Sequence, residues 1–194
     1  MAEPLIGAVE AGGTKFVCAL ARADRTIVAR VRLPTRTPAE TLPALRAWFE
    51  AAGAVHGRIA AFGVASFGPL DLDPRSPGYG AFAATPKPGW RGARIGDALA
   101  GFAAPVALDT DVNGAALGEF VAGAGRGCAT LAYVTVGTGI GAGVVRDGRP
   151  LSGFSHYEMG HIRPPRDRVA DPYAGGCPSH GDCLEGLASG PAIL

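Results

Sequence analysis

Short apolar runs separated by tight turns fill the first part of the chain. The runs span Leu5–Glu10, Phe16–Ala21 and Thr26–Leu33, and the turns between them span Ala11–Lys15 and Arg22–Arg25. Strand-length apolar runs joined by turns of this kind predict an antiparallel meander. We therefore expect three strands that are neighbours both in sequence and in space.

A helical pattern follows the meander. Pro38–Ala52 has helical periodicity, Thr37 suits the N-cap, and Gly53 is the predicted stop. The apolar positions that share one face of this helix are Leu42, Leu45, Trp48 and Phe49. This face predicts packing against a sheet.

The middle of the chain alternates strands, loops and helices. Ile59–Ala65 is predicted to be a buried strand, and Asp71–Trp90, rich in proline and glycine, a long irregular connection. A short helix is expected at Ile95–Gly101, a strand at Pro105–Leu108, and a second helix at Asp111–Val121.

A second meander repeats the opening pattern. Thr130–Val136 and Ala142–Arg146 are predicted strands joined by Gly137-Thr138-Gly139-Ile140-Gly141, as the first two strands are joined by a turn containing Gly12-Gly13-Thr14. We call these the second and the first glycine turn. Glycines allow the backbone to approach an anion, and the exposed N–H groups can bind phosphate oxygens. One such turn also fits an ordinary hairpin, but two matched turns favour phosphate binding.

Composition excludes several classes of function. With a net charge of +1, from 18 basic and 17 acidic residues, the chain offers no global electrostatic attraction for nucleic acid. Apolar runs stay shorter than the roughly 18 residues of a membrane span, and the start does not resemble a signal peptide. These features predict a cytoplasmic protein.

Four residues of metal-ligating types, two histidines and two cysteines, lie near the end of the sequence. His161, Cys177, His180 and Cys183 match the ligand set of a closed tetrahedral zinc site. The alternatives are a Cys177–Cys183 disulfide and His156 as a substitute ligand. We predict structural zinc, because cytosolic thiols favour metal over disulfide.

Several motifs resemble the ROK sugar kinases, most closely their bacterial fructokinase-type members. The resemblance covers essentially the whole chain. Its motifs are Ala11-Gly12-Gly13-Thr14-Lys15, Asp109 to Glu119, Gly137-Thr138-Gly139-Ile140-Gly141, and Glu158-Met159-Gly160-His161 with the cysteines and histidine that follow.

The resemblance implies an actin-like ATPase (ribonuclease H-like) fold. Two α/β domains, each around a mixed five-stranded sheet, would flank a substrate cleft. We expect residues 1–120 to form the N-terminal domain and residues 121–194 a partial C-terminal domain. Ser189–Leu194 begins a helix where the sequence stops, so the second domain is expected to be truncated.

The resemblance also implies the site residues. Asp111 would be the catalytic base, although it and Asp109 both suit a helix N-cap. ATP, with Mg²⁺, would bind the two glycine turns, and the zinc would be structural. The implied phosphate-binding residues are Gly12, Gly13, Thr14, Gly137, Thr138, Gly139 and Gly141; the implied sugar-binding residues are Gly68, Thr110, Asp111, Glu158, His161 and Glu185.

The implied activity is ATP-dependent phosphorylation of a hexose. Thr110, where many family glucokinases carry Asn, and a cluster with two cysteines favour fructose at its 6-hydroxyl. A glucose or mannose kinase and a truncated, non-catalytic sugar-binding remnant are the alternatives. A homodimer is expected, without nucleic acid or membrane partners.

The sequence leaves the roles of two further groups of basic residues open. Lys15 suits phosphate contact or a solvated position beside the first glycine turn. Arg163, Arg166 and Arg168 are interpreted as a solvated loop face, with the mouth of the cleft as the alternative.

Overall fold

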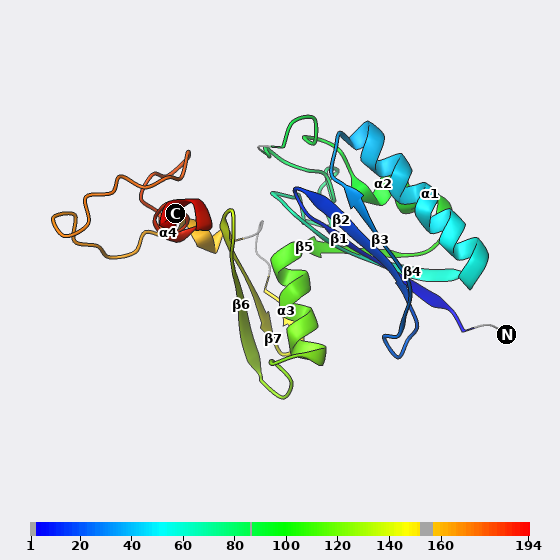
Figure 1. Cartoon of the computed structure of the whole chain (residues 1–194). Helices are drawn as coiled ribbons and strands as arrows, with labels where there is room; N and C mark the ends of the chain where they lie inside the picture. Colours follow the sequence, from blue (N-terminus) through cyan, green and yellow to red (C-terminus); the bar gives the residue numbers. More distant parts are fainter. Residues whose placement is uncertain (1–2, 86, 152–156) are drawn as a thin grey trace. The chain divides into compact units, whose positions relative to one another are not determined.

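A computed structural model of the chain describes residues 3–85, 87–151 and 157–194 (Figure 1). It contains two compact units. The first includes Met1–Asp111, and the second includes Val112–Gly153 and Tyr157–Leu194. The boundary at residue 120 stays a prediction; in the structure, helix α3 (Asp111–Ala122) packs almost entirely with the second unit.

A five-stranded mixed sheet organises the first unit. Its strand order is β3-β2-β1-β4-β5. The pairs β1–β2 and β2–β3 are antiparallel, which confirms the predicted meander, and the pairs β1–β4 and β4–β5 are parallel. The strands are β1 (Leu5–Ala11), β2 (Lys15–Ala21), β3 (Ile27–Pro34), β4 (Ile59–Ser66) and β5 (Val106–Thr110).

Helix α1 (Pro38–His56) begins as predicted but continues beyond Gly53. At its start, the N–H and hydroxyl of Thr37 both donate to the Glu40 carboxylate. The predicted stop at Gly53 is wrong: the helix ends at His56 and is capped by Gly57, whose φ of 121° suits glycine. An interior glycine costs only about 1 kcal/mol, which packing against the sheet can offset.

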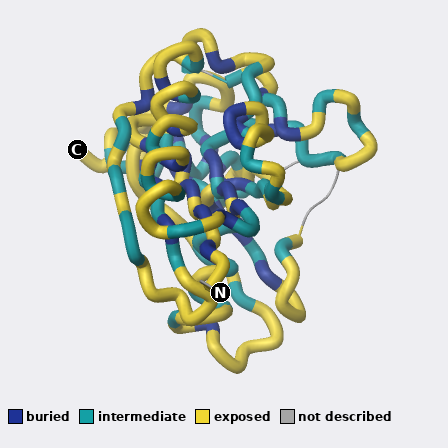
Figure 2. Tube along the Cα trace, turned by 90° about the vertical axis from the view of Figure 1, so that its right-hand side faces the viewer, coloured by how far each residue is buried: buried dark blue, intermediate teal, exposed yellow. Residues whose placement is uncertain are grey.

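Figure 2 marks the buried residues in dark blue, and those of the first unit form one core that is rich in aromatic side chains. Phe49 of α1 meets Phe62 of β4 edge to face, with ring centroids 5.0 Å apart. Trp90 ends the predicted irregular connection and is fully buried against Phe16, while its indole N–H donates to the Arg36 carbonyl at 2.8 Å. This connection is therefore anchored in the core. After it come α2 (Ile95–Leu99) and the 3₁₀ turn η1 (Ala100–Phe102).

The second unit contains a three-stranded antiparallel sheet in the order β6-β7-β8. Helix α3 packs on β7 at Gly143, where a Cβ atom would lie 2.4 Å from the Val112 carbonyl oxygen. The resemblance implied five strands in each domain; the described part of this unit has three. Its elements are β6 (Thr130–Val136), β7 (Ile140–Arg146), β8 (Arg149–Pro150), η2 (Met159–His161), α4 (Leu184–Ala188) and α5 (Gly190–Ile193).

No helix in residues 3–85, 87–151 and 157–194 is both long and apolar enough to cross a membrane.

Candidate functional site

Three parallel strands of the first unit end at one edge of the sheet. The last residue of β4, Ser66, pairs with Ala11 at the end of β1 and with Thr110 at the end of β5. The first glycine turn, Gly68 and Asp111 follow these ends directly. Ligands of open α/β sheets bind at the carboxyl ends of strands. The register of β1, β4 and β5 therefore places the first glycine turn, Gly68 and Asp111 at the edge of the sheet where such ligands bind.

The first glycine turn has its carbonyl groups occupied. Thr35 holds two of them: its hydroxyl donates to Gly12 at 2.7 Å and its N–H to Thr14 at 2.9 Å. The Lys87 ammonium donates to the Gly13 carbonyl at 2.5 Å. Within the described residues the N–H groups of Gly13 and Thr14 have no acceptor. This leaves backbone donors for an anion.

The strand β5 leads directly into α3 at the predicted catalytic position. Thr110 is buried, and its N–H is held by the Asp109 carboxylate at 2.7 Å. Asp111 is the first residue of α3. The two acidic residues are thus distinguished by position: Asp109 lies within β5, and Asp111 lies beyond its end.

The second glycine turn is shorter than predicted. Gly137-Thr138-Gly139 connects the strands, whereas Ile140 and Gly141 belong to β7. The Ile140 N–H donates to Glu185 Oε2 at 2.9 Å. A Cβ atom at Gly139 would lie 2.5 Å from that oxygen, and the Gly137 carbonyl accepts the Gly190 N–H at 2.7 Å. The turn is therefore fixed by α4 and α5.

The four predicted metal ligands lie together. Their ligand atoms are all within 4.8 Å of one another, and we call them the Cys–His cluster. The Cys177 sulfur lies 3.8 Å from Nδ1 of both His161 and His180, and the Cys183 sulfur 3.5 Å from Nδ1 of His161. Tetrahedral zinc, with bonds of about 2.3 Å to sulfur and about 2.0 Å to nitrogen, would separate such ligands by about 3.6 Å. The donor set and the spacing both fit zinc.

The backbone on either side of two cluster residues, Cys183 and His161, packs closely against neighbouring elements. Cys183 precedes α4, and its sulfur accepts the Gly186 N–H at 3.4 Å. Gly160, next to His161, packs so tightly on β7 that a Cβ atom there would lie 1.8 Å from the Ile140 carbonyl oxygen. Gly160 thus allows the loop that carries His161 to lie against the sheet, and the Gly186 N–H holds the Cys183 sulfur at the start of α4.

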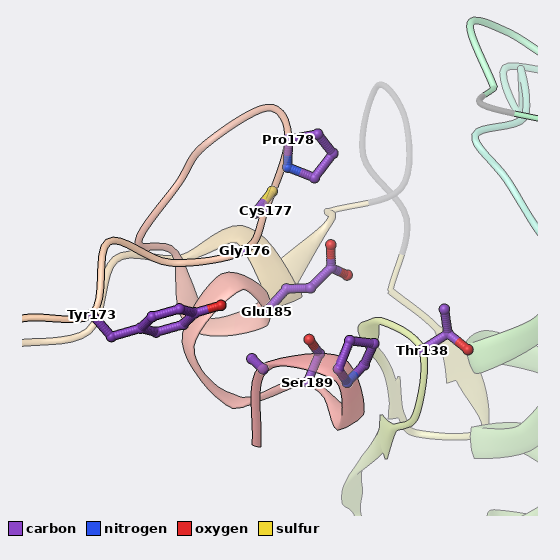
Figure 3. Close-up of a pocket in the computed structure, with 9 residues that line it drawn as sticks. Thr138, Tyr173, Gly176, Cys177, Pro178, Glu185 and Ser189 are labelled. Carbon is purple, nitrogen blue, oxygen red and sulfur yellow. The ribbon is translucent and has the colours of Figure 1, made fainter. Parts of the chain in front are cut away.

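Glu185 connects the Cys–His cluster to the second glycine turn. Its Oε2 accepts the Ile140 N–H, and its Oε1 lies 4.0 Å from Nδ1 of His161. Glu185 also lines a pocket of about 140 Å³, together with Cys177 of the cluster and Thr138 of the turn (Figure 3). The residues that line this pocket are Thr138, Tyr173, Gly176, Cys177, Pro178, Glu185, Ser189, Pro191 and Ala192.

The remaining predicted residues are distributed as follows. Glu158 precedes η2 with a left-handed backbone, φ 48°, and its carbonyl accepts the His161 N–H. Cys177 and Cys183 are free thiols, so the alternative disulfide is not formed. His156, the substitute ligand, lies outside the described residues. Burial raises the pKa of the Cys18 thiol to about 12, which makes this core cysteine inert.

The three arginines before the cluster are not all solvated. Arg163 and Arg168 both donate to the Asp182 carboxylate, at 2.7 Å for Arg163. Arg166 has a side chain only 11% exposed and donates to the Asp171 carboxylate and to the Tyr173 carbonyl. The interpretation as a solvated face is wrong for Arg166. Sequence charge alone did not show that Asp182, between two predicted metal ligands, would form ion pairs with these arginines.

Asp182→Asn is expected to lower the free energy of unfolding by about 1–3 kcal/mol, because charge-assisted hydrogen bonds near a largely buried Arg166 are lost. Urea unfolding at fixed zinc concentration measures this change. Asp147→Asn is the control, since Asp147 is exposed in another turn of the same unit. Equal effects of both substitutions would contradict the inference that the ion pairs of Asp182 stabilise this loop.

Comparison with known proteins gives one family. A model of the ROK family matches residues 6–194. The chain is 49% identical over 190 residues to a putative fructokinase of Bacillus subtilis and 50% identical over 196 residues to a fructokinase of Zymomonas mobilis. These matches cover 97% and 98% of this chain but 62% and 64% of the two relatives.

A solved structure supports the same assignment. The ROK family glucokinase from Streptomyces griseus, in complex with glucose and AMPPNP, is similar with a TM-score of 0.75 and 30% identity. The similarity covers 97% of this chain and 58% of that one. The predicted actin-like ATPase fold is thereby confirmed. The chain spans about three fifths of the length of its relatives.

Proposed function

Because this chain belongs to the ROK family, we propose that it transfers the γ-phosphoryl group of ATP to the 6-hydroxyl of fructose. One structural observation carries the proposal: the first glycine turn and Asp111 follow parallel strands whose ends are in register. Such an edge suits a phosphate next to a carboxylate. The choice of fructose rests on the identity to the two fructokinases.

In the proposed reaction, Asp111 acts on the sugar hydroxyl. Its carboxylate orients the 6-hydroxyl and accepts the proton as the oxygen bonds to the γ-phosphorus. The bond from that phosphorus to the β,γ-bridging oxygen breaks, and ADP leaves. Since such transition states are loose, the proton moves late and an ordinary carboxylate is basic enough.

The glycine turns have an electrostatic role in this proposal. The free N–H groups of Gly13 and Thr14 would donate to phosphate oxygens. The resemblance implies the same role for the second turn, where the N–H of Gly139 is the proposed donor; Gly141, another implied residue, lies in β7 opposite Thr135. Mg²⁺ bound with ATP would supply the further neutralisation of charge. Positioning of this kind can contribute about 7–11 kcal/mol to catalysis.

The Cys–His cluster would hold structural zinc and orient the sugar-binding side chains. His161 belongs to the cluster, and the Glu185 carboxylate lies 4.0 Å from the His161 ring. Glu158 lies three residues before His161 in the chain. Gly68 and Thr110 are proposed as further sugar contacts beside Asp111. We also propose a cytoplasmic homodimer, as the sequence resemblance implies.

A coupled assay of ADP release with fructose, glucose and mannose tests the function. We expect the highest kcat/KM with fructose and ATP. Faster turnover of glucose or mannose would reassign the substrate. Binding of fructose without ADP release would instead identify a non-catalytic sugar-binding protein.

A further inference from the structure

The chain contains two lysines, and both lie at the first glycine turn. Lys15 directly follows this turn in the sequence. The ammonium of Lys87 reaches the turn from a position 74 residues away and donates to the Gly13 carbonyl. All other basic side chains except the histidines are arginines. Lys87 is therefore a compact positive charge delivered to this turn by the tertiary structure.

The position of Lys87 is fixed by the core of the first unit. Its carbonyl accepts the N–H of Trp90, the fully buried anchor of this loop, and its own N–H donates to the Thr85 hydroxyl at 3.3 Å. The Trp90 indole donates to Arg36, next to the Thr35 that holds Gly12 and Thr14. Trp90, which holds the Lys87 loop, is therefore hydrogen-bonded to the residue next to Thr35, which holds the first glycine turn.

The contacts of the ammonium leave it able to bind an anion. Lysine carries three donors, and the Gly13 carbonyl uses one of them. Within the described residues no carboxylate forms an ion pair with Lys87. The positive charge therefore lies uncompensated beside the free N–H groups of Gly13 and Thr14.

We propose that Lys87 binds the terminal phosphate of the nucleotide together with these N–H groups, an inference that rests on the proposed kinase function. The bond to the Gly13 carbonyl holds the turn open to the phosphate before the nucleotide arrives. A remaining ammonium donor then contacts a γ-phosphate oxygen. This contact adds a fixed positive charge where negative charge is transferred.

Amine acylation tests the contact directly, because two lysines and the N-terminus are the only amines to map. Mass spectrometry of the peptides gives the acylation rate at Lys15 and Lys87 without ligand, with fructose, and with Mg²⁺ and AMPPNP. We expect the nucleotide to slow acylation of Lys87 at least tenfold, and fructose alone to leave it unchanged. Equal protection by fructose would place Lys87 at the sugar and overturn the inference.

Substitutions of Lys87 separate the effect of its positive charge from that of its hydrogen bond to the Gly13 carbonyl. Lys87→Gln keeps a donor for the Gly13 carbonyl but removes the charge, and should weaken AMPPNP binding, measured by calorimetry, about 10- to 100-fold. Lys87→Arg should restore most of that affinity. The control is Arg91→Gln, which removes an exposed cation just beyond Trp90 on the same loop.

The outcomes distinguish this inference from the proposed function. Normal AMPPNP affinity in Lys87→Gln, or a loss equal to that of Arg91→Gln, would overturn the role of Lys87 and leave the kinase assignment standing. Failure of the unaltered chain to bind AMPPNP would overturn both. Unchanged thermal unfolding of Lys87→Gln with weakened nucleotide binding is the combination that we expect.

Discussion

Asp111→Asn is expected to lower the rate of fructose phosphorylation by about 10²- to 10⁴-fold while fructose still binds. The amide has the shape of the carboxylate but cannot accept the proton of the 6-hydroxyl. At the first position of α3 the amide loses only the favourable interaction of the charge with the helix dipole, about 0.3–1 kcal/mol, so α3 should remain intact. The coupled ADP assay gives kcat, and calorimetry gives the affinity for fructose.

Asp109→Asn is the matched control for this substitution. Its side-chain oxygen can still accept the Thr110 N–H, as the carboxylate does now at 2.7 Å. We expect only a small change in kcat. Near-normal turnover in Asp111→Asn, or an equal loss in both variants, would rule out Asp111 as the proton acceptor.

Removal of zinc is expected to destabilise the second unit and to abolish fructose binding. Structural zinc sites contribute about 10–16 kcal/mol in small modules, comparable with the stability of a whole domain. Loss of the metal would free His161 and, through it, the Glu185 carboxylate that holds the Ile140 N–H. Chelation followed by calorimetric unfolding and fructose titration measures both effects.

Two variants make this prediction specific. Cys183→Ser should reproduce the effect of the chelator and bind less zinc by elemental analysis. Cys128→Ser should do neither, because Cys128 is an exposed thiol outside the Cys–His cluster. Zinc should restore fructose binding to the chelated protein. Full fructose affinity in zinc-free protein would show that the cluster does not organise the sugar site.

Most of the local structure was predictable because it depends on nearby residues. The meander of the first unit, the Thr37 start of α1 and the strands β6 and β7 of the second unit follow from periodicity and turn chemistry. The end of α1 did not. Gly53 has the residue type of a stop, but packing against the sheet outweighs the small cost of a glycine within a helix.

The candidate site was only partly predictable. The ligand types and spacing of the Cys–His cluster pointed to zinc, and the two glycine turns to phosphate. Lys87, Thr35 and Asp182 were missed, because their roles depend on contacts between distant segments. The presence of only two lysines in the whole sequence was the one signal that could have drawn attention to Lys87.

The sequence by itself determined which chemical groups this protein has and which short elements carry them, since hydrophobic period, turn residues and ligand types are local properties. The tertiary structure decided which groups act together. Strand register aligned the ends of β1, β4 and β5, and Trp90 anchored Lys87 beside Gly13. Glu185 joined the Cys–His cluster to the second glycine turn. These contacts arise only when burial of the core fixes distant segments against one another.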